Sequence, residues 1–334
     1  MVPLLLTTFF LAVISTRIIT AFARAYGIVD KPNIPRKKHR VPTPLLGGGG
    51  IILAFLVVSG FCVMNGIIEI PVSYMVACMG ATAILAISGY QDDRYNLSSR
   101  KQFIAVIGAA LWAVWWLNTE IVISNPFGGM LVLSLGVSGI VSFVWLLGMT
   151  MVTKILDGLD GLVTGISAIG GFGIAAFSLA TPYFDKHIAV LSAIFGASCL
   201  GFLVWNYKPA QVFLGNIGST WTGFMLALLA LLGGIKFAVA SLIFTLPSID
   251  FLYVVLKRLK NGKKPWEGDD THLHFRLKNY LGDEKTVWVY YGVALLMSVI
   301  TLFLSSAQKY ALLGVLLVLS LIMIVYVEKR VQKA

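Results

Sequence analysis

The sequence predicts an all-α, polytopic integral membrane protein, a single transmembrane domain over residues 1–334 with about eleven transmembrane helices. Apolar residues make up 58% of the chain, charged residues only 12%, and the mean hydropathy is +0.86. A soluble globular protein carries about 25% charged residues, so this chain has too few to cover a water-exposed surface. The three cysteines (Cys62, Cys78 and Cys199) all lie inside apolar runs. This placement excludes a disulfide-rich secreted protein and indicates packing thiols.

Apolar stretches of about 20 residues, the length that crosses the hydrocarbon core, follow one another along the chain. The first run contains no small-residue cleavage site, so we expect a retained span rather than a signal peptide. Residues 120–135 are expected at the membrane interface. The predicted spans are roughly 3–24, 45–65, 72–91, 103–119, 136–153, 161–181, 187–206, 212–233, 237–256, 287–306 and 310–327.

The charged residues predict the orientation. If the N-terminus lies outside, the segments between predicted spans alternate between the inner and the outer side. Of the 26 Lys and Arg, 21 then fall in these inner gaps and three in the outer gaps. Short cytoplasmic loops are rich in Lys and Arg, so the split supports the predicted spans and predicts a multi-pass membrane protein with a basic cytoplasmic surface. No basic helix is interleaved with aromatics, which argues against nucleic-acid binding. The ionisable residues lie at helix ends rather than mid-span, which disfavours a transporter.

Two acidic pairs lie in successive inner gaps. Asp92 and Asp93 close the third predicted span, where carboxylates oppose the helix dipole, and this indicates a functional reason for them. Asp157 and Asp160 lie between long apolar runs and share a face if the segment is helical. Such buried acids require a cation, a metal or hydrogen-bond donors. The structural alternative for the second pair is an ion pair with Lys154.

Basic and glycine-rich segments accompany these acids. Gly215 and Gly218 open an apolar helix as an anion cradle would, although a packing turn fits the same pattern. His272 and His274 are two residues apart, on one face if the segment is extended, and Arg276 follows them. Phosphate recognition suits this set better than zinc binding, because no cysteine lies nearby; a solvated charged loop is the alternative.

Together these residues describe one site at the lipid boundary. Carboxylates suit a divalent cation, and basic groups with a glycine turn suit phosphates. The chemistry that needs both is phosphoryl transfer from a nucleotide-type donor to a lipid acceptor.

Five ordered motifs resemble those of a known family. They are DKPNIPRKKHRVPTPLLGG, DDRYNLSSRK, DGLDGL, the stretch from Asn206 to Ser219, and LPSID through to HLHFRL. The chain resembles the polyprenyl-phosphate N-acetylhexosamine-1-phosphate transferases, and more distantly the phospho-MurNAc-pentapeptide translocases. The resemblance covers residues 30–277 and includes part of the inner loop 257–286. The HxH motif is closer to that of the N-acetylhexosamine branch.

The resemblance implies transfer of a sugar-1-phosphate from a UDP-sugar to polyprenyl phosphate at the cytoplasmic face, with release of UMP. It implies Mg²⁺, or Mn²⁺ in its place, and a homodimer. The catalytic acids it implies are Asp92, Asp93, Asp157 and Asp160, and the metal ligands are Asn216 and Asp93. The substrate-binding residues it implies are Arg40, Thr43, Lys101, Lys154, Asn206, Phe213, Gly215, His272, His274 and Arg276.

Three positions depart from the family pattern. Asn216 stands where the family usually has a metal-binding Asp, Lys154 replaces an Asn, and Phe275 replaces a common third histidine. An Asn carbonyl brings no charge, so we expect weaker metal binding. These departures motivate an alternative function, a catalytically impaired relative that acts as a lipid-binding or partner-binding scaffold.

Overall fold

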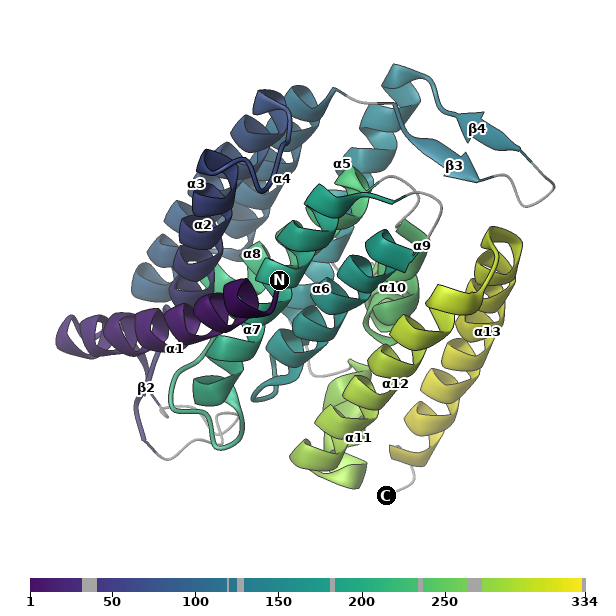
Figure 1. Ribbon diagram of the computed structural model, residues 1–334. Helices are drawn as coiled ribbons and strands as arrows, with labels where there is room; N and C mark the ends of the chain where they lie inside the picture. The colour runs from purple at the N-terminus through teal and green to yellow at the C-terminus, as the bar shows by residue number, and fades with distance from the viewer. Residues whose placement is uncertain are drawn as a thin grey trace.

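The computed structural model describes residues 1–31, 41–118, 120–124, 129–180, 184–233, 237–262 and 272–331. It confirms an all-α protein built from long apolar helices that lie side by side (Figure 1). Helices dominate because a backbone in lipid must satisfy its polar groups within its own segment. The helices are α1 (Val2–Ala25), α2 (Gly48–Met64), α3 (Val72–Tyr95), α4 (Ser99–Leu117), α5 (Leu135–Leu156), α6 (Leu162–Ala180), α7 (Lys186–Asn206), α8 (Gly215–Leu232), α9 (Phe237–Ile243), α10 (Thr245–Lys260), α11 (Leu273–Leu281), α12 (Asp283–Phe303) and α13 (Ser306–Val331).

Within the described residues, seven helices are long and apolar enough to cross a membrane, and the bent pair α9 and α10 adds an eighth. This confirms a multi-pass membrane protein, whereas the count of about eleven stays a prediction. The described part of α13 and helix α2 are apolar but shorter. Helix α4 begins with two basic residues, Arg100 and Lys101.

The predicted span 237–256 is a bent pair of helices rather than one straight helix. The helix is interrupted at Phe244, and the axes of α9 and α10 meet at 80°. Pro247 lies in the first turn of α10. A proline there has no N–H to donate, and its ring would clash with the carbonyl four residues earlier, on Ile243, in a continuous helix. The bend therefore follows from the position of this proline.

Two short antiparallel ladders complete the fold. Strand β1 (Val29–Asp30) pairs with β2 (Thr43–Pro44), and β3 (Val122–Ser124) pairs with β4 (Met130–Val132). Figure 1 shows the β3–β4 hairpin at the top of the molecule, away from α11. The three residues of β4 are all exposed and apolar. The predicted interfacial segment is therefore this hairpin.

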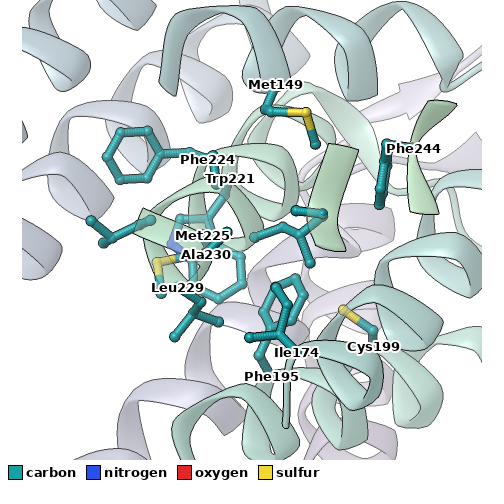
Figure 2. Packing of buried hydrophobic residues seen from close by; sticks show 14 of the residues in the cluster. Met149, Ile174, Phe195, Cys199, Trp221, Phe224, Met225, Leu229, Ala230 and Phe244 are labelled. Atoms are coloured by element: carbon teal, nitrogen blue, oxygen red, sulfur yellow. The ribbon is translucent and has the colours of Figure 1, made fainter. Parts of the chain in front are cut away.

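Helices α6, α7 and α8 form the centre of the bundle and are mostly buried. Trp221 of α8 is fully buried and packs edge-on against Phe55. Its ring lies 6.0 Å from that of Phe195, and its indole N–H donates to Thr82 Oγ1 at 3.0 Å. Figure 2 shows Trp221 and Phe195 within this apolar cluster, with free Cys199 in the same region.

Glycines let α8 approach two neighbouring helices closely. A Cβ on Gly48 of α2 would lie 2.1 Å from the Cα of Gly218. A Cβ on Gly89 of α3 would lie 2.3 Å from the Cα of Ile217. Small residues permit such backbone contact between helices in membranes. Because Gly89 is four residues before Asp93, this contact also sets the position of that acid.

Candidate active site

The connections between helices meet at one end of the bundle, opposite the β3–β4 hairpin. Side-chain contacts join the ends of α3, α5 and α7 to the starts of α4 and α8 and to the turn before α6. The start of α11 contacts α10 through His272 and the turn before α6 through His274. The two acidic pairs and the HxH segment, separated in sequence, therefore share one region. Arg40 and residues 263–271, which belong to the predicted site, lie outside the described residues.

Asp93 fills the predicted anion cradle with the protein's own carboxylate. Its Oδ1 accepts the backbone N–H of Asn216 at 2.7 Å, and Oδ2 accepts that of Ile217 at 3.4 Å. Gly215 has φ +72°, and a Cβ there would lie 2.5 Å from Asp93 Oδ2. The start of α8 is thus capped from α3, as the free N–H groups of a helix start require.

Asp92 belongs to a different network. Gln102 of α4 donates from Nε2 to Asp92 Oδ1 at 2.6 Å and to the carbonyl of Leu97 at 2.8 Å. Lys154 of α5 donates to the side-chain oxygen of Gln102. The Lys154 ammonium is therefore directed toward the first acidic pair, and the structure shows no ion pair with Asp157 or Asp160 for this lysine. Sequence reasoning missed Gln102, although it follows the predicted residue Lys101, which is exposed in the first turn of α4.

The second acidic pair lies on a turn rather than on a helical face. Asp157 is the C-cap of α5, and Gly161 has φ +78°, which interrupts the helical conformation before α6. Asp160 accepts the backbone N–H of Ala210 at 3.0 Å, so it fixes the loop that follows α7. The condition under which Asp157 and Asp160 would share a helical face is therefore not met. We call residues 157–161 the 157–161 turn.

Asp157 remains solvent-accessible, yet protein atoms crowd its carboxyl from most sides. This desolvation, together with the charges of Asp93 and Asp160, raises its pKa from 3.8 to about 8. A group in this state favours binding of a proton or a cation. Asp157 is therefore the acid at the site whose charge is least compensated by the described residues.

Asn206 and Tyr291 hold the 157–161 turn from two sides. The side-chain oxygen of Asn206 accepts from the N–H of Gly161 at 3.0 Å and from the Thr164 hydroxyl at 2.9 Å. Its Nδ2 donates to the carbonyl of Val212 at 3.0 Å. Tyr291 of α12 donates its hydroxyl to the carbonyl of Gly161 at 2.6 Å. Sequence reasoning missed Tyr291, because its contact spans 130 residues.

The segment of Thr43 lies beside the loop before α8. The backbone N–H of Phe213 donates to the carbonyl of Pro44 at 2.9 Å, and that of Gly47 donates to the carbonyl of Phe213 at 3.1 Å. Thr43 itself is buried. Two predicted substrate-binding residues, Thr43 and Phe213, are thus brought together by backbone pairing.

The HxH segment is held by the acid of the LPSID motif, which the sequence reasoning did not assign to the site. Asp250 of α10 accepts from His272 Nδ1 at 3.0 Å and from the backbone N–H of Leu273 at 2.8 Å. His272 precedes α11, and His274 lies in its first turn, so the segment is only partly extended. The two imidazole rings are nevertheless stacked, with centroids 5.8 Å apart. Arg276 is buried in the same helix.

His274 lies against the 157–161 turn. Its Nε2 is 3.0 Å from the position of a Cβ on Gly158, and Phe275 Cζ is 2.7 Å from it. Only glycine fits beneath these two rings. Burial, with the charges of His272 and Lys278, lowers the pKa of His274 to about 3, so its ring is neutral at physiological pH.

The donor set suits a hard cation more than zinc. No three His, Cys, Asp or Glu side chains in the described ranges are arranged to hold a metal ion. Asp93, Asp157 and Asp160 interact electrostatically and offer carboxylate oxygens. Asn216, whose backbone N–H binds Asp93, carries a side-chain carbonyl oxygen. Oxygen ligands of this kind, completed by water and substrate phosphates, are typical of Mg²⁺.

Comparison with known proteins places this arrangement in a family. Residues 75–234 match the model of glycosyl transferase family 4. A Bacillus subtilis protein named a probable undecaprenyl-phosphate N-acetylglucosaminyl 1-phosphate transferase is 30% identical, over 94% of this chain and 88% of its own length. A decaprenyl-phosphate N-acetylglucosaminephosphotransferase of Mycolicibacterium smegmatis is 26% identical, over 95% and 86% of the two chains. An Escherichia coli K12 undecaprenyl-phosphate alpha-N-acetylglucosaminyl 1-phosphate transferase is 29% identical, over 75% and 69%. The chain therefore belongs to the polyprenyl-phosphate N-acetylhexosamine-1-phosphate transferase family.

Proposed function

We propose that this protein transfers N-acetylhexosamine-1-phosphate from a UDP-sugar to polyprenyl phosphate and releases UMP. The observation that carries the proposal is the meeting of the Asp92, Asp157 and His274 segments at one end of an apolar bundle. The names of the relatives support a polyprenyl phosphate acceptor and an N-acetylglucosamine-1-phosphate product group. The reaction would begin the synthesis of a cell-envelope glycan.

We place the site at the cytoplasmic face of the cell membrane, with the N-terminus outside. The distribution of Lys and Arg supports this orientation. A UDP-sugar is a cytoplasmic metabolite, which also favours this face. We extend the proposal to all eleven spans, including α2, α4 and α13. We also propose a homodimer, which light scattering of the detergent-solubilised protein would test.

In the proposed reaction, Asp92 accepts the proton of the lipid phosphate. An oxygen of that phosphate then attacks the β-phosphorus of the donor, and the bond from this phosphorus to the oxygen bridging to the α-phosphate breaks. UMP leaves with the bonding electrons. The Lys154 ammonium, linked to Asp92 through Gln102, offsets negative charge beside the acidic pair.

We propose Mg²⁺ as the cofactor, with Mn²⁺ as a substitute. Oxygens of Asp93, Asp157 and Asn216 would hold it, with water and the donor diphosphate completing the set. When bound, the metal would neutralise diphosphate charge and improve the leaving group. Because Asn216 brings no charge, the Mg²⁺ concentration for half-maximal turnover should be high and should fall in the Asn216→Asp variant.

Purified protein in detergent, incubated with UDP-N-acetylglucosamine, undecaprenyl phosphate and Mg²⁺, tests the proposal. The expected products are UMP and a lipid diphosphate sugar, whose mass exceeds that of the lipid phosphate by the mass of the transferred sugar-phosphate group. Turnover that depends on Mg²⁺ would exclude the scaffold alternative. The absence of UMP from both the unaltered chain and the Asn216→Asp variant, with a panel of UDP-hexosamines, would refute the proposal.

A further inference from the structure

The two histidines of the HxH segment have different surroundings. Both ring nitrogens of His272 are already engaged, because Nδ1 donates to Asp250 Oδ2 at 3.0 Å and Nε2 lies 3.4 Å from a guanidinium nitrogen of Arg258. His272 is also 2% exposed. A ring held in this way has no nitrogen left for a ligand.

His274 has the opposite character. It is fully buried, and neither ring nitrogen has a hydrogen-bond partner in the part of the chain that the structure describes. Buried polar atoms are normally paired, so an unpaired imidazole in a site indicates a missing ligand. A neutral imidazole offers one N–H donor and one acceptor nitrogen. Its Nε2 lies 3.0 Å from the position of a Cβ on Gly158, the residue that follows Asp157.

Asp250 connects these two histidines to the scaffold. Helix α11 has no side-chain cap of its own, since the residue at its N-cap is His272. Asp250 supplies the missing cap from α10, because its Oδ1 accepts the N–H of Leu273 at 2.8 Å while its Oδ2 binds His272. One carboxylate thus fixes both the start of α11 and the orientation of the His272 ring.

Ring stacking couples the orientation of His274 to that of His272. The ring centroids of His272 and His274 are 5.8 Å apart and the rings are inclined by only 21°, and the Phe275 ring also contacts His274, with centroids 4.2 Å apart. A change in the orientation of the His272 ring would therefore displace His274 from the 157–161 turn. Without Asp250, the N–H of Leu273 and Nδ1 of His272 at the start of α11 would lose the acceptor that the structure shows for them.

We infer that Asp250 is a positioning residue that acts through His272 to hold His274 at the 157–161 turn, and that His274, rather than His272, contacts the nucleotide-sugar donor. The identity of the ligand rests on the proposed function, whereas the positioning of His274 by Asp250 does not. The donor diphosphate would accept the N–H that His274 presents beside Asp157.

A double-mutant cycle on binding of UDP tests this division of roles. Calorimetric titration with UDP should show about tenfold weaker affinity in Asp250→Asn and in His274→Ala, the loss expected for a hydrogen bond to a charged group. The double variant should bind no more weakly than His274→Ala, because Asp250 acts through that ring. If the fold losses of UDP affinity in the two single variants multiply in the double variant, the inference is overturned.

Asp185→Asn is the matched control. Asp185 caps α7 near the opposite end of the bundle and accepts two backbone N–H groups, from His187 at 3.1 Å and Ile188 at 3.0 Å. This variant makes the same chemical change at another helix start. Its affinity for UDP should equal that of the unaltered chain, and an equal loss in both variants would refute a specific role for Asp250.

Chemical modification of His274 provides a readout that does not depend on the ligand. Diethyl pyrocarbonate, followed by mass spectrometry of the peptide, should leave His274 unmodified in the unaltered chain and in Asp185→Asn, and should modify it in Asp250→Asn. Continued protection in Asp250→Asn would overturn the positioning role. If UDP does not bind the unaltered chain at all, the donor contact fails, and the modification result still decides the positioning.

His272→Ala serves as a second variant if Asp250→Asn does not yield folded protein. It removes the ring through which Asp250 acts and leaves the bond from Asp250 to the N–H of Leu273 in place. Diethyl pyrocarbonate should then modify His274, and the losses of UDP affinity should not multiply when His272→Ala is combined with His274→Ala. Continued protection of His274 and unaltered UDP binding in His272→Ala would contradict the inference.

Discussion

The four acids of the candidate active site have different hydrogen-bond partners, and each arrangement suits a different role. Asp93 and Asp160 accept backbone N–H groups and so fix the start of α8 and the loop after α7. Asp92 accepts a side-chain bond from Gln102 and a backbone bond from Leu97 in the connection to α4, and Asp157 is left without a hydrogen bond within the described residues. We therefore assign proton transfer to Asp92 and cation binding chiefly to Asp157.

Asp92→Asn should reduce turnover by about 100-fold or more, the range of general base catalysis. The thermal midpoint should hardly change, because Asn can still accept the Gln102 bond. Asp93→Asn should reduce turnover and also lower the midpoint, since the cap on α8 is weakened. Both quantities can be measured on purified protein in detergent. Activity retained by both variants would remove the pair from the mechanism.

Asp157→Asn should stabilise the protein, and the effect should depend on pH. The raised pKa means that the folded state binds a proton that the unfolded state has already lost between pH 3.8 and about 8. Stability from this group is therefore full below the lower value and is lost as pH rises to the upper one. The gain in thermal midpoint should be small at pH 5 and several degrees at pH 8.5, without Mg²⁺. An equal gain at both pH values would contradict the raised pKa.

Gly215→Ala should inactivate the protein more than backbone strain alone explains. Gly215 and Gly66 have nearly equal φ values, +72° and +68°, so a Cβ at either position carries a similar strain of about 1 kcal/mol. Only at Gly215 would the Cβ also meet Asp93, whereas nothing lies within 4 Å at Gly66. Gly66→Ala is therefore the control. Equal thermal midpoints and turnover for the two variants would argue against the Asp93 cap.

At the scale of the elements, the close contact of α3 with α8 positions the site. Gly89→Ala would force the two backbones apart at Ile217 and lengthen the bond from Asp93 to Asn216. We expect lower thermal stability together with lower turnover. Gly108→Ala in α4 meets nothing within 4 Å and should be neutral or stabilising by about 0.5–1 kcal/mol. A thermal scan with an activity assay separates the two results.

The break between α9 and α10 is the second element that determines the site. A straight helix over residues 237–256 would carry Asp250 along the bundle axis, whereas the 80° bend at Phe244 turns α10 toward α11. Pro247 supplies the local reason, and the buried contact of Asp250 with His272 supplies the tertiary one. The bend and the HxH segment are therefore one structural unit.

For the molecule as a whole, the proposed topology predicts opposite locations for two exposed helix ends. Asn65 follows α2, and Asn96 follows α3. In a background with the three native cysteines replaced by serine, Asn65→Cys should react with a membrane-impermeant maleimide in intact bacterial cells. Asn96→Cys should react only after the membrane is opened. The reverse pattern would contradict the orientation, and labelling of both in intact cells would contradict the spans.

The sequence alone determined the class of protein, most helix positions and the identity of the acidic pairs. These properties depend on local composition: apolar runs must become helices in lipid, and charges must leave it at the ends. The same local reasoning gave residues 237–256 as one span without its bend, and it left open a helical segment at Asp157 and Asp160 that the structure does not contain, because Pro247 and Gly161 interrupt helices there.

Only the tertiary structure decided what each polar residue faces. The Gly215 cradle holds Asp93, and Lys154 is directed toward Gln102 and Asp92. The contacts of Asp250 with His272 and of Tyr291 with Gly161 join segments 22 and 130 residues apart. No spacing rule along a chain encodes such partners, because they are set by how closely the helices pack.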